Sequence, residues 1–180
     1  MINEKVIIAG FGGQGVMLMG QILSFCATAK DINTLWFPSY GPETRGGTAN
    51  CSVTISEESV NSPVISTPDS IMIMNKPSLN KFMPKLKKGG NLFANTSLVK
   101  DLDYRDDVNV YEIPANDLAL EIGNLKVANM VMVGAYLAIT KIFTEDEVIN
   151  VLKEKFTGEK AKLIDINRLA LETGRKAVTK

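Results

Sequence analysis

Short apolar runs and glycine-rich turns alternate over the first 40 residues of the chain. Val6 to Gly10 is an apolar run that ends on glycine, which favours a parallel strand buried on both faces. From Gln14 to Ala29 apolar side chains recur every three or four residues, as on the buried side of a helix, and Asn33 to Phe37 supplies a second strand. This order predicts a right-handed βαβ unit whose two strands lie side by side or nearly so.

The later pattern first extends the sheet and then changes to helix. Residues 49–56 alternate between apolar and polar, which predicts a strand covered on one face only. Further strands are expected at 69–75, 91–95 and 108–113, and helices at 77–86, 116–122, 125–142, 145–156 and 166–178. We therefore expect one domain over residues 1–180, a three-layer α/β fold. Its mainly parallel, Rossmann-like sheet should carry helices on both faces, with a helical C-terminal third.

Charge and composition narrow the classes of function. The 20 basic and 20 acidic residues cancel, which argues against nucleic acid as a partner. The start of the chain lacks the features of a signal peptide, and the apolar stretch at 127–142 is shorter than a bilayer requires, so we expect a cytoplasmic protein without a membrane contact. With no histidine and only Cys26 and Cys51, the chain is expected to hold no metal.

The first glycine-rich loop follows the first predicted strand. Gly10, Gly12 and Gly15 match the G-x-G-x-x-G spacing that brings backbone close to a phosphate at a helix N-terminus. A standard NAD site is disfavoured, because the second strand lacks the acidic residue that holds the ribose. The glycines either permit tight packing alone or present N–H groups to a ligand or partner. The candidate phosphate or partner loop comprises Gly10, Gly12, Gly13, Gln14 and Gly15.

A second loop is expected from Pro38 to Gly47, after the second strand. It combines turn formers with an aromatic ring, a carboxylate and a guanidinium fork that suits a carboxylate or phosphate. Because both loops follow neighbouring strands, they should emerge together at the carboxyl ends of the sheet. A plain connector is the alternative. The candidate interface residues are Tyr40, Gly41, Pro42, Glu43, Arg45, Gly46 and Gly47.

Together, the two loops resemble the gamma domain of the 2-oxoacid:ferredoxin oxidoreductases, which include enzymes for pyruvate and 2-oxoglutarate. The resemblance rests on residues 10–16, on 39–43 with 45–47, on the strand 50–53 with 55–56, and on Ser62-Pro63. It covers the first 95 or so residues well and the helical remainder only in length and type. The Ser-Tyr-Gly-Pro-Glu sequence followed by Arg-Gly-Gly is similar to the 2-oxoglutarate type.

This resemblance implies a non-catalytic gamma subunit of a multisubunit enzyme that converts a 2-oxo acid to an acyl-CoA and reduces ferredoxin. Thiamine diphosphate, Mg²⁺ and iron–sulfur clusters would then belong to alpha and beta subunits, with a ferredoxin-like delta subunit as a further partner and CoA as co-substrate. No cofactor would be bound tightly by this chain, and an isolated chain would be inactive and able to form a homodimer. Alternatives are an indolepyruvate or pyruvate enzyme, or a free-standing nucleotide- or CoA-binding α/β enzyme.

Three kinds of side chain have a structural interpretation beside a functional one. Cys26 and Cys51 lie on apolar stripes and are expected to be buried, unreactive thiols. The methionines in strands and helices are expected to fill the core. Trp36 and Phe37, beside both loops, either pack internally or anchor a partner.

Overall fold

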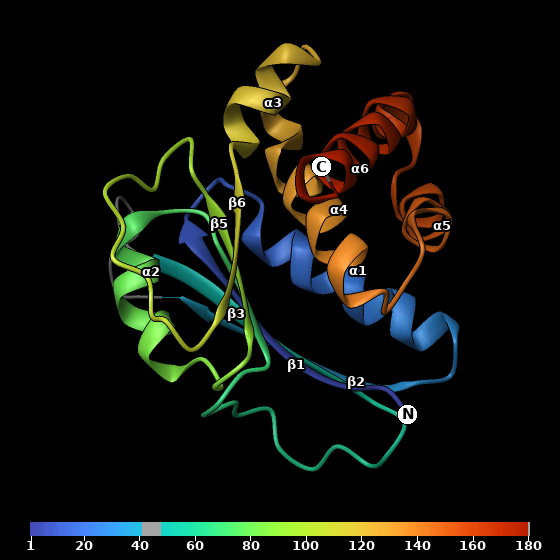
Figure 1. Ribbon diagram of the computed structural model, residues 1–180. Coiled ribbons are helices and arrows are strands. Elements are labelled where there is room, and N and C mark those ends of the chain that lie inside the picture. Colours follow the sequence, from blue (N-terminus) through green and yellow to red (C-terminus); the bar gives the residue numbers. More distant parts are fainter. Residues whose placement is uncertain (41–47, 180) are drawn as a thin grey trace.

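The computed structural model describes residues 1–40 and 48–179 (Figure 1). Its strands are β1 (Asn3–Phe11), β2 (Asn33–Tyr40), β3 (Thr48–Ser56), β4 (Ser70–Ile73), β5 (Asn91–Asn95) and β6 (Asn109–Ile113). Its α-helices are α1 (Val16–Ala29), α2 (Lys76–Phe82), α3 (Ala115–Glu121), α4 (Ala128–Thr140), α5 (Glu145–Lys155) and α6 (Ile164–Val178). Short 3₁₀ helices are η1 (Met83–Lys85), η2 (Leu125–Val127) and η3 (Gly158–Leu163).

The described strands form one mainly parallel sheet in the order β2-β3-β1-β4-β5-β6. Strands β1, β4, β5 and β6 pair in parallel, whereas β3 is antiparallel to both of its neighbours, β1 and β2. The two strands of the expected βαβ unit, β1 and β2, therefore run in the same direction, as predicted. They are not direct neighbours, since β3 lies between them, but only this one strand separates them.

The prediction that residues 49–56 form a half-exposed strand is wrong. Cys51, Val53 and Ile55 face the helices and are fully buried, but Asn50 and Thr54 on the other face are also buried. The reason is that the segment after β3, within residues 58–64, lies beside Thr54 and Ser56 on this face, which a local alternation of apolar and polar residues does not reveal. The polar side chains of β3 lie against this segment and a hollow beside it.

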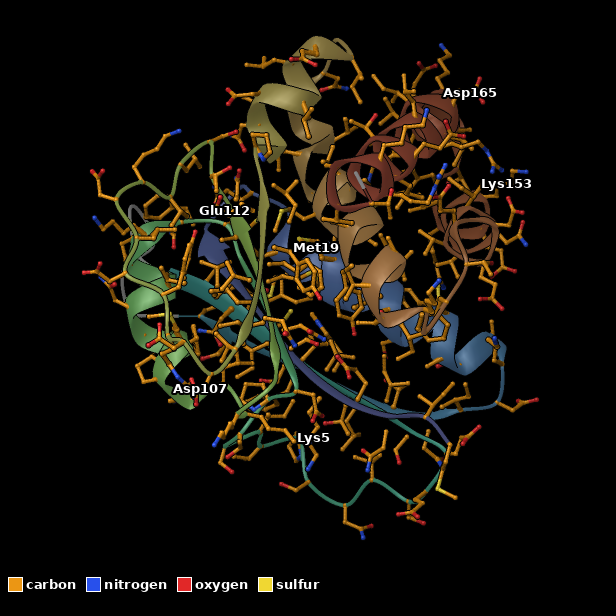
Figure 2. All side chains as sticks on the ribbon, viewed as in Figure 1. Lys5, Met19, Asp107, Glu112, Lys153 and Asp165 are labelled. Atoms are coloured by element: carbon orange, nitrogen blue, oxygen red, sulfur yellow. The ribbon has the colours of Figure 1, made fainter. Side chains whose placement is uncertain are left out.

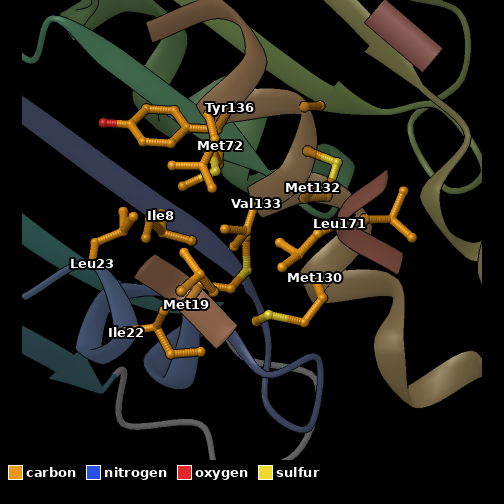
Figure 3. Close-up of a cluster of buried hydrophobic side chains, with 14 of the residues drawn as sticks. Ile8, Met19, Ile22, Leu23, Met72, Met130, Met132, Val133, Tyr136 and Leu171 are labelled. Atoms are coloured by element: carbon orange, nitrogen blue, oxygen red, sulfur yellow. The ribbon is translucent and has the colours of Figure 1, made fainter. Parts of the chain in front are cut away.

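Most helices lie on one face of the sheet. Figure 1 shows α1, α4, α5 and α6 together on this face and α2 on the other. Figure 3 shows part of the larger core between sheet and helices, to which Met19 and Ile22 of α1, Met72 of β4 and Val133 of α4 all belong. The core-filling interpretation of the methionines is confirmed for Met19, Met72, Met74, Met130 and Met132.

Strand β2 continues beyond the predicted boundary. Pro38, Ser39 and Tyr40 were expected to open the second loop, but they extend β2 and pair with β3. A proline is tolerated here because β2 is an edge strand and one of its sides needs no N–H donor. The rest of that predicted loop, residues 41–47, lies outside the described residues.

Helix α5 is fixed at its start by a capping box and by ion pairs. Thr144 and Glu147 exchange side-chain-to-backbone hydrogen bonds, as their spacing predicts. Glu147 also pairs with Lys30, the C-cap residue of α1, at 2.9 Å, and Glu145 pairs with Arg175 of α6 at 2.7 Å. Outward-pointing charged side chains such as Lys153 and Asp165 line the outer surface of these helices, while Met19 lies inside (Figure 2). No helix in the described part of the chain is long and apolar enough to cross a bilayer.

Candidate functional site

The sheet has a point where successive connections leave in opposite directions. After β1 the chain passes through α1 toward β2, and after β4 it passes through α2 toward β5. Since β1 and β4 are neighbours, their carboxyl ends border the crevice in which open α/β folds place their ligands. The Gly10 to Gly15 loop lies at this crevice.

Gln14 holds the glycine loop in one conformation. Its Oε1 accepts a 2.6 Å hydrogen bond from the Phe11 N–H, and its backbone N–H donates to the Phe11 carbonyl at 3.3 Å. Its Nε2 donates to the Met74 carbonyl, 3.4 Å away, just beyond β4. These hydrogen bonds of the Gln14 side chain link the loop to the residue after β4 and fix the position of the loop beside the crevice.

The glycines of this loop differ in whether their surroundings leave room for a side chain. A side chain at Gly10 would overlap Gln14 Oε1 at 2.5 Å and Met74 Cβ at 2.8 Å, and one at Gly15 would overlap the Asn129 amide. A side chain at Gly12 or Gly13 would have no neighbour within 4 Å in residues 1–40 and 48–179, although Gly13 has a φ of +88° that favours glycine. Tight packing alone therefore accounts for Gly10 and Gly15 but not for Gly12.

Several backbone N–H groups at this loop are available to a ligand. The amides of Gly12, Gly13 and Gly15 have no acceptor among the described residues, and Gly15 caps α1 without a side-chain hydrogen bond. The first turn of α1 contains no acidic residue. The N-terminal N–H groups of a helix lack internal partners and carry partial positive charge, so this arrangement favours an anion.

A hollow of about 430 Å³ adjoins the loop. Its walls come from β1's loop, the end of β4 and the junction of α3 with α4, and its lining residues are Gly13, Gln14, Met74, Asn116, Asn124, Leu125, Lys126, Ala128 and Asn129. Lys126 is the only charged side chain among these lining residues, and the Asn124 side chain accepts from its backbone N–H at 3.0 Å. The hollow thus brings together the glycine loop, the Lys126 ammonium and the side-chain amides of Asn116, Asn124 and Asn129.

Lys126 and Asn129 were missed by the sequence analysis. They belong to the start of the helical C-terminal third, far along the chain from Gly15, and nothing in their local pattern brings them to the loop. One weak feature of the sequence points to this part of the hollow. Asn124 lies two residues before Lys126, at the start of an apolar helical pattern, and asparagine there is typical of a helix N-cap.

The second predicted loop is described only at its ends. Tyr40 pairs with Ala49, and Phe11 of β1 pairs with Thr48, so the ends of β1 and β2 lie at the same edge of the sheet with β3 between them. Tyr40 is 72% exposed there. Gly41, Pro42, Glu43, Arg45, Gly46 and Gly47 lie outside the described residues, and their proposed role stays a prediction.

The environment of the first loop is also unlike a dinucleotide site. Strand β2 carries no acidic residue, and it does not neighbour β1, since β3 intervenes. The strand that holds the ribose in a standard NAD site is therefore displaced.

Both cysteines are buried structural thiols. Burial raises the pKa of Cys26 and of Cys51 to about 12, so neither is a thiolate near neutral pH. Within residues 1–40 and 48–179, no group of three or more cysteine, aspartate or glutamate side chains could hold a metal.

These features define an α/β protein with a glycine-rich loop at the switch point of its sheet. Residues 5–177 match the family model for pyruvate ferredoxin/flavodoxin oxidoreductase, and the chain belongs to this family as a gamma-type chain. A solved structure of similar extent agrees: the keto/oxoacid ferredoxin oxidoreductase gamma subunit of Geobacter sulfurreducens superposes with a TM-score of 0.82 at 26% identity, covering 97% of this chain and 98% of that one.

Two curated relatives differ in how much of their length is matched. The chain is 39% identical to the ketoisovalerate oxidoreductase subunit VorA of Methanothermobacter marburgensis over 171 residues, which is 94% of this chain but 35% of VorA. It is 33% identical to the 2-oxoglutarate synthase subunit KorC of Methanothermobacter thermautotrophicus over 187 residues, 98% of this chain and 96% of KorC.

One larger structure has the same fold as part of its chain. The 2-oxoglutarate:ferredoxin oxidoreductase of Magnetococcus marinus, solved with 2-oxoglutarate, coenzyme A and succinyl-CoA bound, superposes with a TM-score of 0.89 at 22% identity. The match covers 99% of this chain and 31% of that chain. At this identity the likeness shows the fold alone.

Proposed function

We propose that this chain is the non-catalytic gamma subunit of a multisubunit 2-oxoacid:ferredoxin oxidoreductase, folded as a single domain. The observation that carries the proposal is the match to KorC, a separate chain, over 96% of its length. The chain's own residues do not fit a reacting centre: both thiols are buried with a raised pKa, and the sequence has no histidine for acid–base catalysis near neutral pH. The complex would oxidise a 2-oxo acid to an acyl-CoA and reduce ferredoxin.

Partner alpha and beta subunits would supply what this chain lacks. In the proposed enzyme they hold thiamine diphosphate, Mg²⁺ and the iron–sulfur clusters, and a ferredoxin-like delta subunit is a further partner. An affinity tag on this chain, introduced in the source organism, should recover them with a 2-oxo-acid-dependent and CoA-dependent reductase activity. A tagged chain that purifies alone, without thiamine diphosphate or iron, would contradict the proposal.

The substrate is best sought among four 2-oxo acids. We favour 2-oxoglutarate, supported by the near-complete match to KorC, and the 39% identity to VorA makes ketoisovalerate the second candidate. Pyruvate and indolepyruvate complete the series. The ratio of kcat/KM among the four acids, measured on the purified complex, identifies the substrate.

We further propose that the glycine loop and its hollow face the CoA side of the complex. The amides of Gly12, Gly13 and Gly15, which have no acceptor in the described part of the chain, and the ammonium of Lys126 suit a phosphate group, and the 430 Å³ hollow leaves room beside it. The loop that contains Arg45 is a second candidate for the same phosphate, or for a carboxylate on a partner subunit.

Lys126 provides a test of the CoA contact. Lys126→Ala should raise the KM for CoA by roughly tenfold, because it removes one charge-assisted contact, and should leave the KM for the 2-oxo acid unchanged. Lys153→Ala, on the exposed face of α5, is the matched control. An unchanged KM for CoA in the Lys126 variant would refute this contact while leaving the subunit assignment intact.

The rival proposal is a free-standing nucleotide- or CoA-binding enzyme. Calorimetry on the isolated chain with NAD, NADP, FAD and CoA separates the two. Tight binding of a dinucleotide by the isolated chain would favour the rival.

A further inference from the structure

The face of the sheet on the side of α2 is apolar at β4 and β5 and more polar toward β3 and β2. Ile71 of β4 and Leu92 of β5 pack there in a small apolar core with Phe82 of α2. Strand pairing continues this row from Ile71 to Ile7 of β1, then to Ser52 of β3 and Phe37 of β2. The apolar row under α2 thus gives way to a polar residue and an aromatic one at the edge of the sheet.

Five residues at this edge of the sheet form a surface that we call the open face: Phe37, Ser39, Asn50, Ser52 and Val64. They line one hollow of about 230 Å³, together with residues from β1, from the segment after β3 and from α2 and η1. Phe37 is 49% exposed and Val64 is 74% exposed. The neighbouring residue of β2, Trp36, packs into the larger core on the opposite face, so the exposure of Phe37 is a property of this face and not of the strand.

The composition of the open face is typical of a protein–protein interface. It combines a half-exposed aromatic ring and an exposed aliphatic side chain with the hydroxyl groups of Ser39 and Ser52, beside the buried Asn50. Interface centres are enriched in aromatic residues and are surrounded by polar groups that pair with the partner. A core face would instead carry apolar side chains on the interior strand β3.

The described residues around the open face carry charge of one sign. Among the described residues that line its hollow, Lys81 and Lys85 are the charged ones, and neither makes an ion pair with a described carboxylate. The segment 76–88 that carries them has five lysines and no acidic residue. A surface of complementary charge would therefore bring carboxylates to this rim.

We propose that the open face is the docking surface for a partner subunit of the oxidoreductase. The partner's surface would place an apolar or aromatic side chain against Phe37 and Val64, and carboxylates against Lys81 and Lys85. This inference rests on the proposed function. In VorA the matched region is 35% of a longer chain, so in that relative the gamma-type region is joined to further protein.

A second copy of this chain is the less suitable occupant. A twofold dimer brings the same patch of both copies together. At the open face this would collect the lysines of both copies in one interface, and the described residues that line the hollow supply no carboxylate to pair with them. A partner with carboxylates meets no such penalty.

Two variants test the docking surface by pull-down on the tagged complex. Phe37→Asp and the double variant Lys81→Glu, Lys85→Glu should each reduce partner retention by roughly 30-fold or more, as loss of an interface hot spot does. The lysine pair is exposed, so the double variant tests the face even if Phe37→Asp impairs folding. Matched controls are Leu120→Asp, at a residue of α3 that is 60% exposed, and the double variant Lys153→Glu, Lys160→Glu. Circular dichroism checks that each variant is folded.

The outcomes separate this inference from the proposed function. If the wild-type chain retains partners and both open-face variants retain them equally, the open-face inference is overturned and the subunit assignment stands. If the wild-type chain retains no thiamine-diphosphate-containing partner, the proposed function fails and the inference fails with it. A wild-type homodimer that Phe37→Asp converts to a monomer would replace the proposed partner by a second copy. Loss of partners in both open-face variants, with the controls unchanged, supports the inference.

Discussion

Two pairs of glycines in this chain have opposite surroundings. At the crossing of α4 and α6, a side chain at Gly134 would meet the Leu171 carbonyl, and one at Gly174 would meet the Val131 carbonyl. At the end of β1, a side chain at Gly12 or Gly13 would meet no atom of the described residues within 4 Å. We call the α4–α6 crossing the closed region, because backbone atoms of the facing helix fill the space beside its glycines. We call the glycine loop the open region, because no described atom lies beside Gly12 or Gly13.

This difference separates glycines that the fold requires from glycines that it does not. The α4–α6 contact can form only where both helices lack a side chain, because main-chain atoms cannot move aside as the end of a long side chain can. At Gly12 neither packing nor a left-handed φ calls for glycine. An unexplained glycine at an edge with free amides supports a role in which another molecule approaches the backbone.

The largest expected effect is at the α4–α6 crossing. Gly174→Ala should lower the free energy of unfolding by about 3 kcal/mol or more, since the added methyl must separate two packed helices. Urea denaturation of the purified chain measures this change. Ala138→Gly in α4 is the control, with an expected loss of about 1 kcal/mol from helix propensity alone. If Gly174→Ala instead raised stability by that propensity difference, the close crossing would be refuted.

A smaller effect is expected at Gly15, where the open region meets α4. Gly15→Ala should cost about 2 kcal/mol, because Gly15 has a φ of +73° and its added side chain would meet Asn129. In an Asn129→Ala background the contact is gone but the backbone conformation remains, so a cost of about 1 kcal/mol should persist. Denaturant unfolding of the four proteins forms a double-mutant cycle. Strict additivity would show that Asn129 is not the obstacle.

The sequence predicted local structure better than contacts between distant segments. Gly10 to Gly15 follows an apolar run and precedes a helical pattern, so the strand, the turn and the helix were all predicted from neighbouring residues. The position of β3 between β1 and β2 was not, since strand order depends on contacts between distant segments. For the same reason Lys126 and Asn129 were not associated with the loop, although they lie at its hollow.

Pro38 illustrates a second limit of the sequence. Turn chemistry made it the predicted start of a loop, yet it lies within β2 and pairs with Cys51. Proline is excluded from interior strands but not from edges, and a local pattern does not reveal which strand is at the edge. The family resemblance was carried by the glycine loop and its neighbours, and it correctly predicted the gamma-type chain.

Glu4 of β1, whose carboxylate accepts a hydrogen bond from Tyr136 of α4, is a titrating group that predicts a pH dependence. Burial raises the pKa of Glu4 above its usual value, with the Asp69 carboxylate adding to the shift, while the Tyr136 hydroxyl 3.1 Å away and Lys87 oppose it. The folded protein therefore holds this proton more tightly than the unfolded chain does. The resulting stabilisation is fully present below roughly pH 4 and is lost as the pH rises through the raised pKa.

Glu4→Gln isolates this contribution, because the amide keeps an oxygen for the Tyr136 hydroxyl but does not titrate. The difference in free energy of unfolding between wild type and Glu4→Gln should shift against the wild type as the pH rises from about 4 to about 7. Urea denaturation across this range measures the difference. A constant difference would mean that the Glu4 pKa is the same in the folded and unfolded chains.

The smallest expected effect on stability is at Gly12, and it gives the sharpest test of the open loop. Gly12→Ala should leave the free energy of unfolding within about 0.5 kcal/mol of wild type, because the added methyl meets open space and the φ is not left-handed. If a CoA phosphate approaches these amides, the same methyl should raise the KM for CoA in the assembled complex. A loss of stability above about 1 kcal/mol would show that the loop is packed after all. An unchanged KM for CoA would mean that the open space at Gly12 does not receive this co-substrate.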